Sequence, residues 1–98
     1  MKNAVSDSHE VQYLEAAIRD LKKLPKDVQR QIIELADDLA KLPRPEGVES
    51  LTQFKGMYRV RVGHYRVIYT VNDKNKVVIV AAVGNRKNIY ELLERRFS

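Results

Sequence analysis

The 98-residue sequence contains no cysteine, and this absence excludes disulfide bonds, thiolate metal sites and cysteine nucleophiles. Its two histidines, His9 and His64, are far apart in the sequence, so no metal site is indicated. The glycines Gly56, Gly63 and Gly84 stand singly, and neither a glycine-rich phosphate loop nor a Ser/His/Asp arrangement is visible. We therefore expect a protein that uses no cofactor and no metal.

Long apolar segments are also lacking. The longest apolar run, Val77–Val83, is far shorter than the ~20 residues that span a bilayer. The stretch Met1–Glu10 has no apolar core of the ~7–15 residues that a signal peptide requires. We therefore expect a soluble, cytoplasmic protein with no membrane partner. Its length predicts one domain over residues 1–98, because typical domains have ~100–200 residues.

Acidic residues are scarce in the second half of the sequence. Residues 51–98 hold ten Lys/Arg against three Asp/Glu, a balance of +7, whereas residues 1–50 hold eight against ten, a balance of −2. A strongly basic half favours a polyanionic partner, most plausibly nucleic acid. The alternative is a charge excess that only keeps the protein in solution.

Apolar spacing in the first half predicts two helices. The first carries one stripe with a period near 3.6 residues, and the second continues the pattern beyond Pro25; the stripes are Leu14, Ala17, Ile18, Leu21 and Leu24, then Val28, Ile32, Leu35, Leu39 and Leu42. Because Pro25 breaks the first helix and suits the opening turn of the second, the two form an antiparallel hairpin. Val11 and Tyr13 alternate with polar residues before it, which indicates a short strand.

The second half changes to a period of two. After a loop at Pro43–Ser50, alternating residues predict strands over 58–62 and 65–71, and the apolar run Val77–Val83 predicts a central strand covered on both faces. Ile89, Leu92, Leu93 and Phe97 form a short helical stripe. The predicted order is β-α-α-β-β-β-α, an α+β fold in which a small antiparallel sheet packs on a helical hairpin.

Gly63 and His64 fit a two-residue hairpin turn with glycine first. In that register Val62 faces Tyr65 and Arg61 faces Arg66, so Arg59, Arg61 and Arg66 share one face of the hairpin. Like charges placed opposite one another destabilise a sheet by roughly 0.2–1 kcal/mol. No acidic residue lies between positions 51 and 72 to offset them. The cluster therefore predicts an anion ligand, and the planar guanidinium group suits phosphate oxygens.

Three segments resemble the RelE/ParE toxin superfamily of bacterial toxin–antitoxin systems. They are LKKLPKDVQRQI (Leu21–Ile32), FKGMYRVRVGHYRVIYTV (Phe54–Val71) and VVIVAAVGNRKNIY (Val77–Tyr90), and the resemblance covers about four-fifths of the chain, Val11–Tyr90. It implies a RelE-like fold, in agreement with the pattern above. It also implies a RelE-like mRNA interferase, an endoribonuclease that cuts mRNA in the ribosomal A site with the substrate's own 2′-hydroxyl as nucleophile and so inhibits translation.

The resemblance also assigns site residues. The family's two strand lysines correspond to Arg59 and Arg61, its hairpin arginine to Arg66, its post-strand arginine to Arg86 and its tyrosine to Tyr90. Arginine replaces both lysines, and because its pKa exceeds ~12 it transfers protons poorly, so these two act as electrostatic clamps. The spacing from Arg86 to Tyr90 is also shorter than in the best-known member.

We therefore expect Arg61, Arg66, Arg86 and Tyr90 to be catalytic, with Tyr90 as general base. A tyrosine has an ordinary pKa of ~10 and works as a base only where neighbouring positive charges lower that value. Phosphate binding is expected from Arg59, Arg61 and Arg66, with the basic neighbours Lys55 and Lys87 added. His64 stays open as a proton donor, and His9 is expected to be incidental to function.

Two other functions stay open at this point. One is a ParE-like gyrase inhibitor on the same fold, and the other is a non-catalytic RNA-binding module. The resemblance further implies as partners the ribosome, mRNA and a RelB-like antitoxin. The antitoxin would cover the basic face or displace the helix around Ile89–Phe97, and operator DNA would be bound only through it.

Overall fold

The computed structural model describes residues 8–98, so most of the stretch Met1–Glu10, on which the expectation about a signal peptide rests, lies outside the described residues. Its elements follow one another in the order β1 (Glu10–Tyr13), α1 (Glu15–Lys22), α2 (Lys26–Lys41), β2 (Glu49–Ser50), β3 (Met57–Val62), β4 (Tyr65–Asn72), β5 (Val77–Asn85) and α3 (Ile89–Phe97). The predicted α+β fold is confirmed. The one element not predicted is the two-residue strand β2, which forms in the segment expected to be a loop.

The two predicted helices of the hairpin are present, with Pro25 at the N-cap of α2. Each buries the middle of its predicted stripe, for example Ala17 in α1 and Ile32 in α2, both fully buried. The margins of the stripes are not covered: Ile18 is 39% exposed and Leu42, one residue beyond α2, is 60% exposed. The apolar surface of the hairpin is therefore wider than the sheet that it covers.

The five strands form one sheet in the order β1-β5-β4-β3-β2. The three pairs among β5, β4, β3 and β2 are antiparallel, but β1 is parallel to β5, with Glu10 opposite Val77 and Tyr13 opposite Val80. The sheet is thus mixed, whereas an antiparallel sheet was predicted. A parallel pair needs a long connection, and here all elements from α1 to β4 lie between its two strands.

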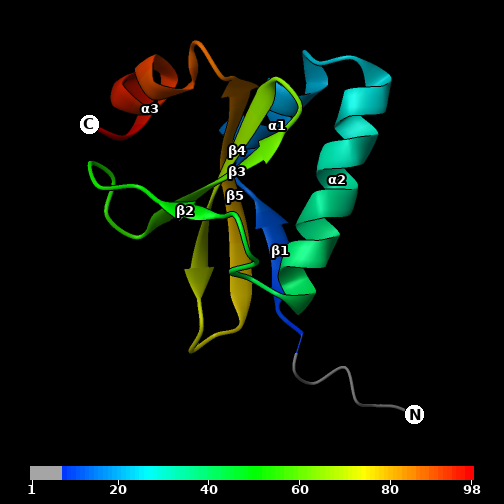
Figure 1. Cartoon of the computed structure of the whole chain (residues 1–98), viewed down its shortest axis with the longest axis vertical. Coiled ribbons are helices and arrows are strands. Elements are labelled where there is room, and N and C mark those ends of the chain that lie inside the picture. Colours follow the sequence, from blue (N-terminus) through cyan, green and yellow to red (C-terminus); the bar gives the residue numbers. More distant parts are fainter. Residues whose placement is uncertain (1–7) are drawn as a thin grey trace.

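The sheet separates two helical layers (Figure 1). On one face α1 and α2 pack against the sheet through a core that includes Val67, Val80 and Val83. On the other face Ile89 and Leu93 of α3 pack against the sheet in a second core. The strand β5 contributes to both cores and is bordered by β1 and β4, which confirms that the apolar run is an interior strand covered on both faces.

One ion pair ties α3 to the opposite helical layer. Arg96 donates from Nη1 and Nη2 to the two carboxylate oxygens of Asp20 in α1, at 2.8 and 3.0 Å. On β5, beyond the last residue pair with β1, the same carboxylate accepts the backbone N–H of Val83 at 3.1 Å, and Arg96 donates to the carbonyl of Ala81 at 3.3 Å. These hydrogen bonds to Asp20 raise the pKa of Arg96. The two side chains therefore provide hydrogen-bond partners for backbone groups on the edge of β5, beyond the point where β1 ends.

Candidate functional site

The β3–β4 hairpin has the register that the sequence predicts. Val62 faces Tyr65 and Arg61 faces Arg66, and Gly63 at the first turn position has a positive φ of 57°, which glycine adopts without strain. We call the side chains of Arg59, Arg61 and Arg66 the arginine face. Ile68, which is opposite Arg59 and two residues after Arg66 on the same face of β4, packs in the core under α3. The arginine face is thus on the α3 side of the sheet.

Arg86 follows β5 and lies close to this face. Its backbone N–H donates to the carbonyl of His64 at 2.9 Å, which ties the turn after β5 to the β3–β4 turn. The pKa of Arg66 is lowered, first by desolvation and then by the positive charges of Arg61, Arg59 and Arg86. Arg66 is therefore close enough to the other three arginines to be repelled by their positive charges. Arg66 also donates to the carbonyls of Gly63 and Tyr65, at 3.3 and 3.0 Å, and these bonds hold its side chain at the turn.

Tyr90 is in the first turn of α3, at the other end of the cluster. Its ring centroid is 5.6 Å from the guanidinium carbon of Arg59, a cation–π contact. The side chain is 40% exposed, so it is not a core residue. The structure thus places Arg86 and Tyr90 beside the arginine face.

Glu49 is the residue that sequence reasoning missed. It is opposite Arg59 in the β2–β3 register, and its carboxylate forms an ion pair with that guanidinium group. It precedes the acid-free stretch by two residues, and because β2 was expected to be loop, no register connected it to Arg59. An alternating pattern of two residues is too short to reveal such a strand.

Two hollows open on the α3 side of the sheet, and Glu49 and Arg59 line both. One, of about 280 Å³, is bounded by residues 49–54 with Arg59 and Tyr90. The other, of about 200 Å³, is bounded by Gly47, Glu49, Arg59, Arg61 and Arg66. The smaller hollow is walled by three guanidinium groups, which suits an anion. The larger one adjoins it and adds the aromatic rings of Phe54 and Tyr90.

The remaining predicted site residues are not drawn into this cluster. Lys55 lies exposed in the turn before β3, Lys87 lies exposed in the turn after β5, and His64 lies exposed in the β3–β4 turn. Within residues 8–98, none of their side chains has a hydrogen bond or ion pair to the arginine face. Lys87 uses its backbone N–H to bond Asn85 Oδ1 at 2.8 Å. Phosphate binding by Lys55 and Lys87 stays a prediction.

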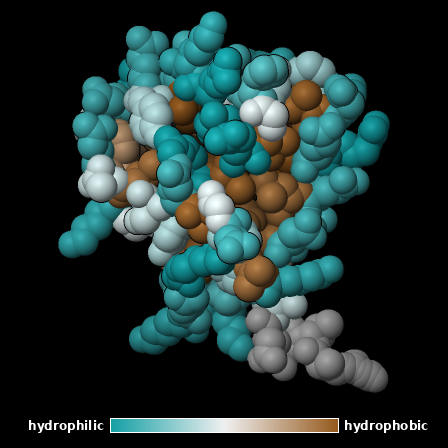
Figure 2. Space-filling model, in the orientation of Figure 1, coloured by the Kyte–Doolittle hydropathy of each residue, from teal (hydrophilic) through white to brown (hydrophobic). Residues whose placement is uncertain are grey.

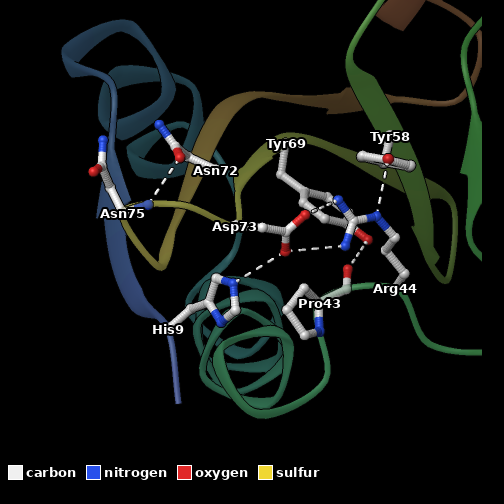
Figure 3. Close-up of polar contacts among 8 residues, drawn as sticks. All are labelled: His9, Pro43, Arg44, Tyr58, Tyr69, Asn72, Asp73 and Asn75. Carbon is white, nitrogen blue, oxygen red and sulfur yellow. Dashed lines mark hydrogen bonds and ion pairs between the residues drawn. The ribbon is translucent and has the colours of Figure 1, made fainter. Parts of the chain in front are cut away.

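A second polar cluster joins the α2–β2 loop to the β4–β5 turn (Figure 3). Arg44 donates to both carboxylate oxygens of Asp73, at 2.8 and 3.3 Å, and to the Tyr58 hydroxyl at 3.0 Å. His9 Nε2 is 3.4 Å from Asp73, and the His9 side chain is only 11% exposed. Tyr69 donates its hydroxyl to the carbonyl of Pro43 at 2.7 Å.

This cluster fastens three chain segments and leaves no cationic surface comparable to the arginine face. Arg44 and Asp73 neutralise each other, and the pKa of Asp73 is lowered, mainly by the hydrogen bonds from Arg44. Burial raises the pKa of Tyr69 to about 12. We interpret the cluster as structural. His9 lies apart from the arginine face, but the structure gives it a packed position at this junction.

Fold and site together define a class: a small basic α+β protein whose sheet presents clustered arginines beside a helix. No helix in the part of the chain that the structure describes is long and apolar enough to cross a membrane. Residues 11–90 match the family model of the ParE toxin of type II toxin–antitoxin systems. The chain belongs to the RelE/ParE toxin superfamily of type II toxin–antitoxin systems.

Relatives with this fold are found in bacteria and archaea. Toxin RelG of Mycobacterium tuberculosis is 32% identical over 81 residues, which cover 82% of this chain and 93% of the relative. RelE in the RelE–RelB complex of Pyrococcus horikoshii is 33% identical with a TM-score of 0.71, covering 81% of this chain and 96% of that one. A mutant of Escherichia coli toxin RelE in the free state is 24% identical with a TM-score of 0.74, covering 93% and 99%, and it supports the fold alone.

Proposed function

We propose that this toxin is a ribosome-dependent mRNA endonuclease that inhibits translation by cutting in the A site. The observation that carries the proposal is the electrostatic cluster of four arginines, Arg59, Arg61, Arg66 and Arg86, with Tyr90 in contact with one of them. Arginine groups that repel one another are stabilised by a phosphate, which carries the opposite charge. The ribosome, as the place of reaction, makes the cytoplasm the expected location.

The cleavage chemistry makes modest demands on the protein. The 2′-oxygen of the substrate attacks the adjacent phosphorus, the bond to the 5′-oxygen breaks, and a cyclic phosphate and a free 5′-hydroxyl result. Attack requires the 2′-oxygen in line with the leaving oxygen and stabilisation of the negative charge on the phosphate. The positive charges of Arg61, Arg66 and Arg86 supply that stabilisation, while Arg59 and Tyr90 border the adjoining hollow.

Two protons also move in this reaction. In the proposal Tyr90 takes the proton from the 2′-hydroxyl, since its hydroxyl is on an exposed side chain beside the arginines. The proton for the 5′-oxygen comes from solvent or from a ribosomal group. His64 is an alternative donor, because it is exposed in the turn whose carbonyl holds Arg86.

Ribosome-dependent cleavage of a defined mRNA, mapped by primer extension, tests the assignment. Tyr90→Phe and Arg86→Ala should each lower the cleavage rate by at least about 100-fold, the range for loss of a general base or of a charge-stabilising group. Tyr65→Phe is the matched control for Tyr90, because Tyr65 is on the α1–α2 side of the sheet. Arg95→Ala, in the last turn of α3, is the control for Arg86. Unchanged cutting by both site variants would remove the assignment.

A gyrase inhibitor is the second candidate, because the matching family model is that of the ParE toxin. Such a protein acts by binding another protein and needs no complete basic site with a tyrosine. A supercoiling assay with purified gyrase separates the two proposals. Inhibition of supercoiling without codon-positioned cuts would favour the gyrase inhibitor. Absence of both activities would favour the non-catalytic RNA-binding module.

We further propose a RelB-like antitoxin as partner, since the P. horikoshii relative is in complex with RelB. Apolar side chains gather at the surface between α2 and the sheet (Figure 2). The partly buried residues of this side include Val28 and Leu35 of α2 and Val60 and Val62 of β3. An amphipathic segment of the partner would bury them, and a second, acidic segment would meet the arginine face on the opposite, α3 side of the sheet. Toxicity of the chain expressed alone, relieved by co-expression with a short acidic neighbouring gene product, is the expected result.

A further inference from the structure

Glu49 is placed where an RNA phosphate is expected. Its carboxylate is paired with Arg59, and it lines both hollows beside the arginine face. Its side chain is 61% exposed, so burial does not hold it there, and the Arg59 side chain that it meets is 26% exposed. It is the only acidic residue in the lining of either hollow.

A carboxylate and a phosphate compete for the same guanidinium group. The two oxygens of a carboxylate, or two oxygens of a phosphate, accept a pair of hydrogen bonds from one arginine. While Glu49 is paired, part of the donor set of Arg59 is occupied, and the cation–π contact with Tyr90 holds the same side chain from another side. The phosphate of a bound RNA would have to take the position of the carboxylate.

The strand that carries Glu49 can release it. β2 has only two residues and forms the edge of the sheet, where it pairs with β3 alone. Short edge strands have few hydrogen bonds to lose and open at small cost in free energy. Gly47, two residues before Glu49, has φ of 91° and marks the bend from which the strand starts.

We propose that Glu49 is an internal ligand of Arg59 that occupies the phosphate position in the free toxin and is displaced when RNA binds. This inference rests on the proposed RNA-binding function of the arginine face. It makes Glu49 a positioning residue that acts through Arg59: it offsets the repulsion within the cluster in the free protein and lowers its affinity for phosphate.

Binding is measured without the ribosome and without cleavage, by fluorescence anisotropy of a labelled 2′-O-methyl RNA nonamer. Glu49→Gln should bind the RNA about two- to fivefold more tightly than the unmodified chain, the factor expected for release of one exposed ion pair. Glu46→Gln is the matched control. It removes the same charge from the loop that leads into β2, and within the described residues Glu46 has no ion pair.

A double-mutant cycle distinguishes the specific interaction of Glu49 with Arg59 from a general structural effect of the substitution. In an Arg59→Gln background the additional change Glu49→Gln should leave the RNA affinity unchanged, because the pair is already broken. Thermal melting of each variant checks that it is folded. An equal gain in Glu46→Gln, or a gain that persists without Arg59, would overturn the proposal.

The outcomes also separate this inference from the proposed function. If the unmodified chain binds the RNA and Glu49→Gln binds no better than Glu46→Gln, only the inference fails. If Glu49→Gln binds more tightly but no variant cuts mRNA on ribosomes, the inference stands and the nuclease proposal fails. If neither the unmodified chain nor Glu49→Gln binds RNA, the inference fails, and cleavage on ribosomes still decides the nuclease proposal.

Discussion

The Asp20–Arg96 pair lends itself to a quantitative stability test. We expect Asp20→Ala to lower the free energy of unfolding by about 2–3 kcal/mol, since it removes two charge-assisted hydrogen bonds and leaves the N–H of Val83 without its acceptor. The side chains of Asp20 and Arg96 are 11% and 20% exposed, so solvent screens the pair only in part. The higher helix propensity of alanine returns about 0.5 kcal/mol, which the expected range includes.

Urea denaturation followed by circular dichroism measures this loss, and in a thermal melt it corresponds to about 8–24 °C. Glu91→Ala is the matched control, because it removes another carboxylate that pairs with an arginine of α3. That pair is 3.7 Å long with side chains 67% and 74% exposed, so we expect a change within about 0.5 kcal/mol. If Asp20→Ala costs no more than Glu91→Ala, the pair does not fasten α3 and our reasoning is wrong.

Three further predictions concern pH and packing. Tyr69 has a pKa raised to about 12 by burial, so its contribution to stability should be complete below pH ~10 and be lost as the pH rises towards 12; Tyr69→Phe should flatten the stability profile in that range. The pKa of Asp73 is lowered, mainly by Arg44, so its contribution should be present above pH ~4 and be lost on further acidification, and Asp73→Asn should remove that loss. Gly84→Ala should cost up to about 1 kcal/mol in urea denaturation, because a Cβ there would be 3.1 Å from Ile89 Cδ1.

The sequence was most informative where local geometry decides the structure. A two-residue turn leaves a hairpin one register, so Gly63 and His64 were enough to place Arg61 opposite Arg66. The helical stripes likewise predicted α1 and α2, since their period reflects burial against a single surface. The arginine cluster follows directly from that register and the alternation of side chains.

Contacts between distant segments were harder to predict. The parallel pairing of β1 with β5, the ion pair of Glu49 with Arg59 and the Arg44–Asp73 pair all join residues that no local pattern connects. A parallel partner leaves no turn signal in the sequence. A charged residue in a segment without a sequence pattern, such as Arg44 or Glu49, meets its partner only after the fold has brought the two segments together.

The position of β5 between β1 and β4 determines when the sheet can form during synthesis. Of the strands in residues 8–98, β1 is made first and pairs only with β5, which is made last. Such non-local pairing delays folding, because the intervening chain must be closed into a loop before the contact forms. Arg86 and Tyr90 come later still. A nascent chain therefore has no complete arginine cluster while β5 and α3 are inside the exit tunnel.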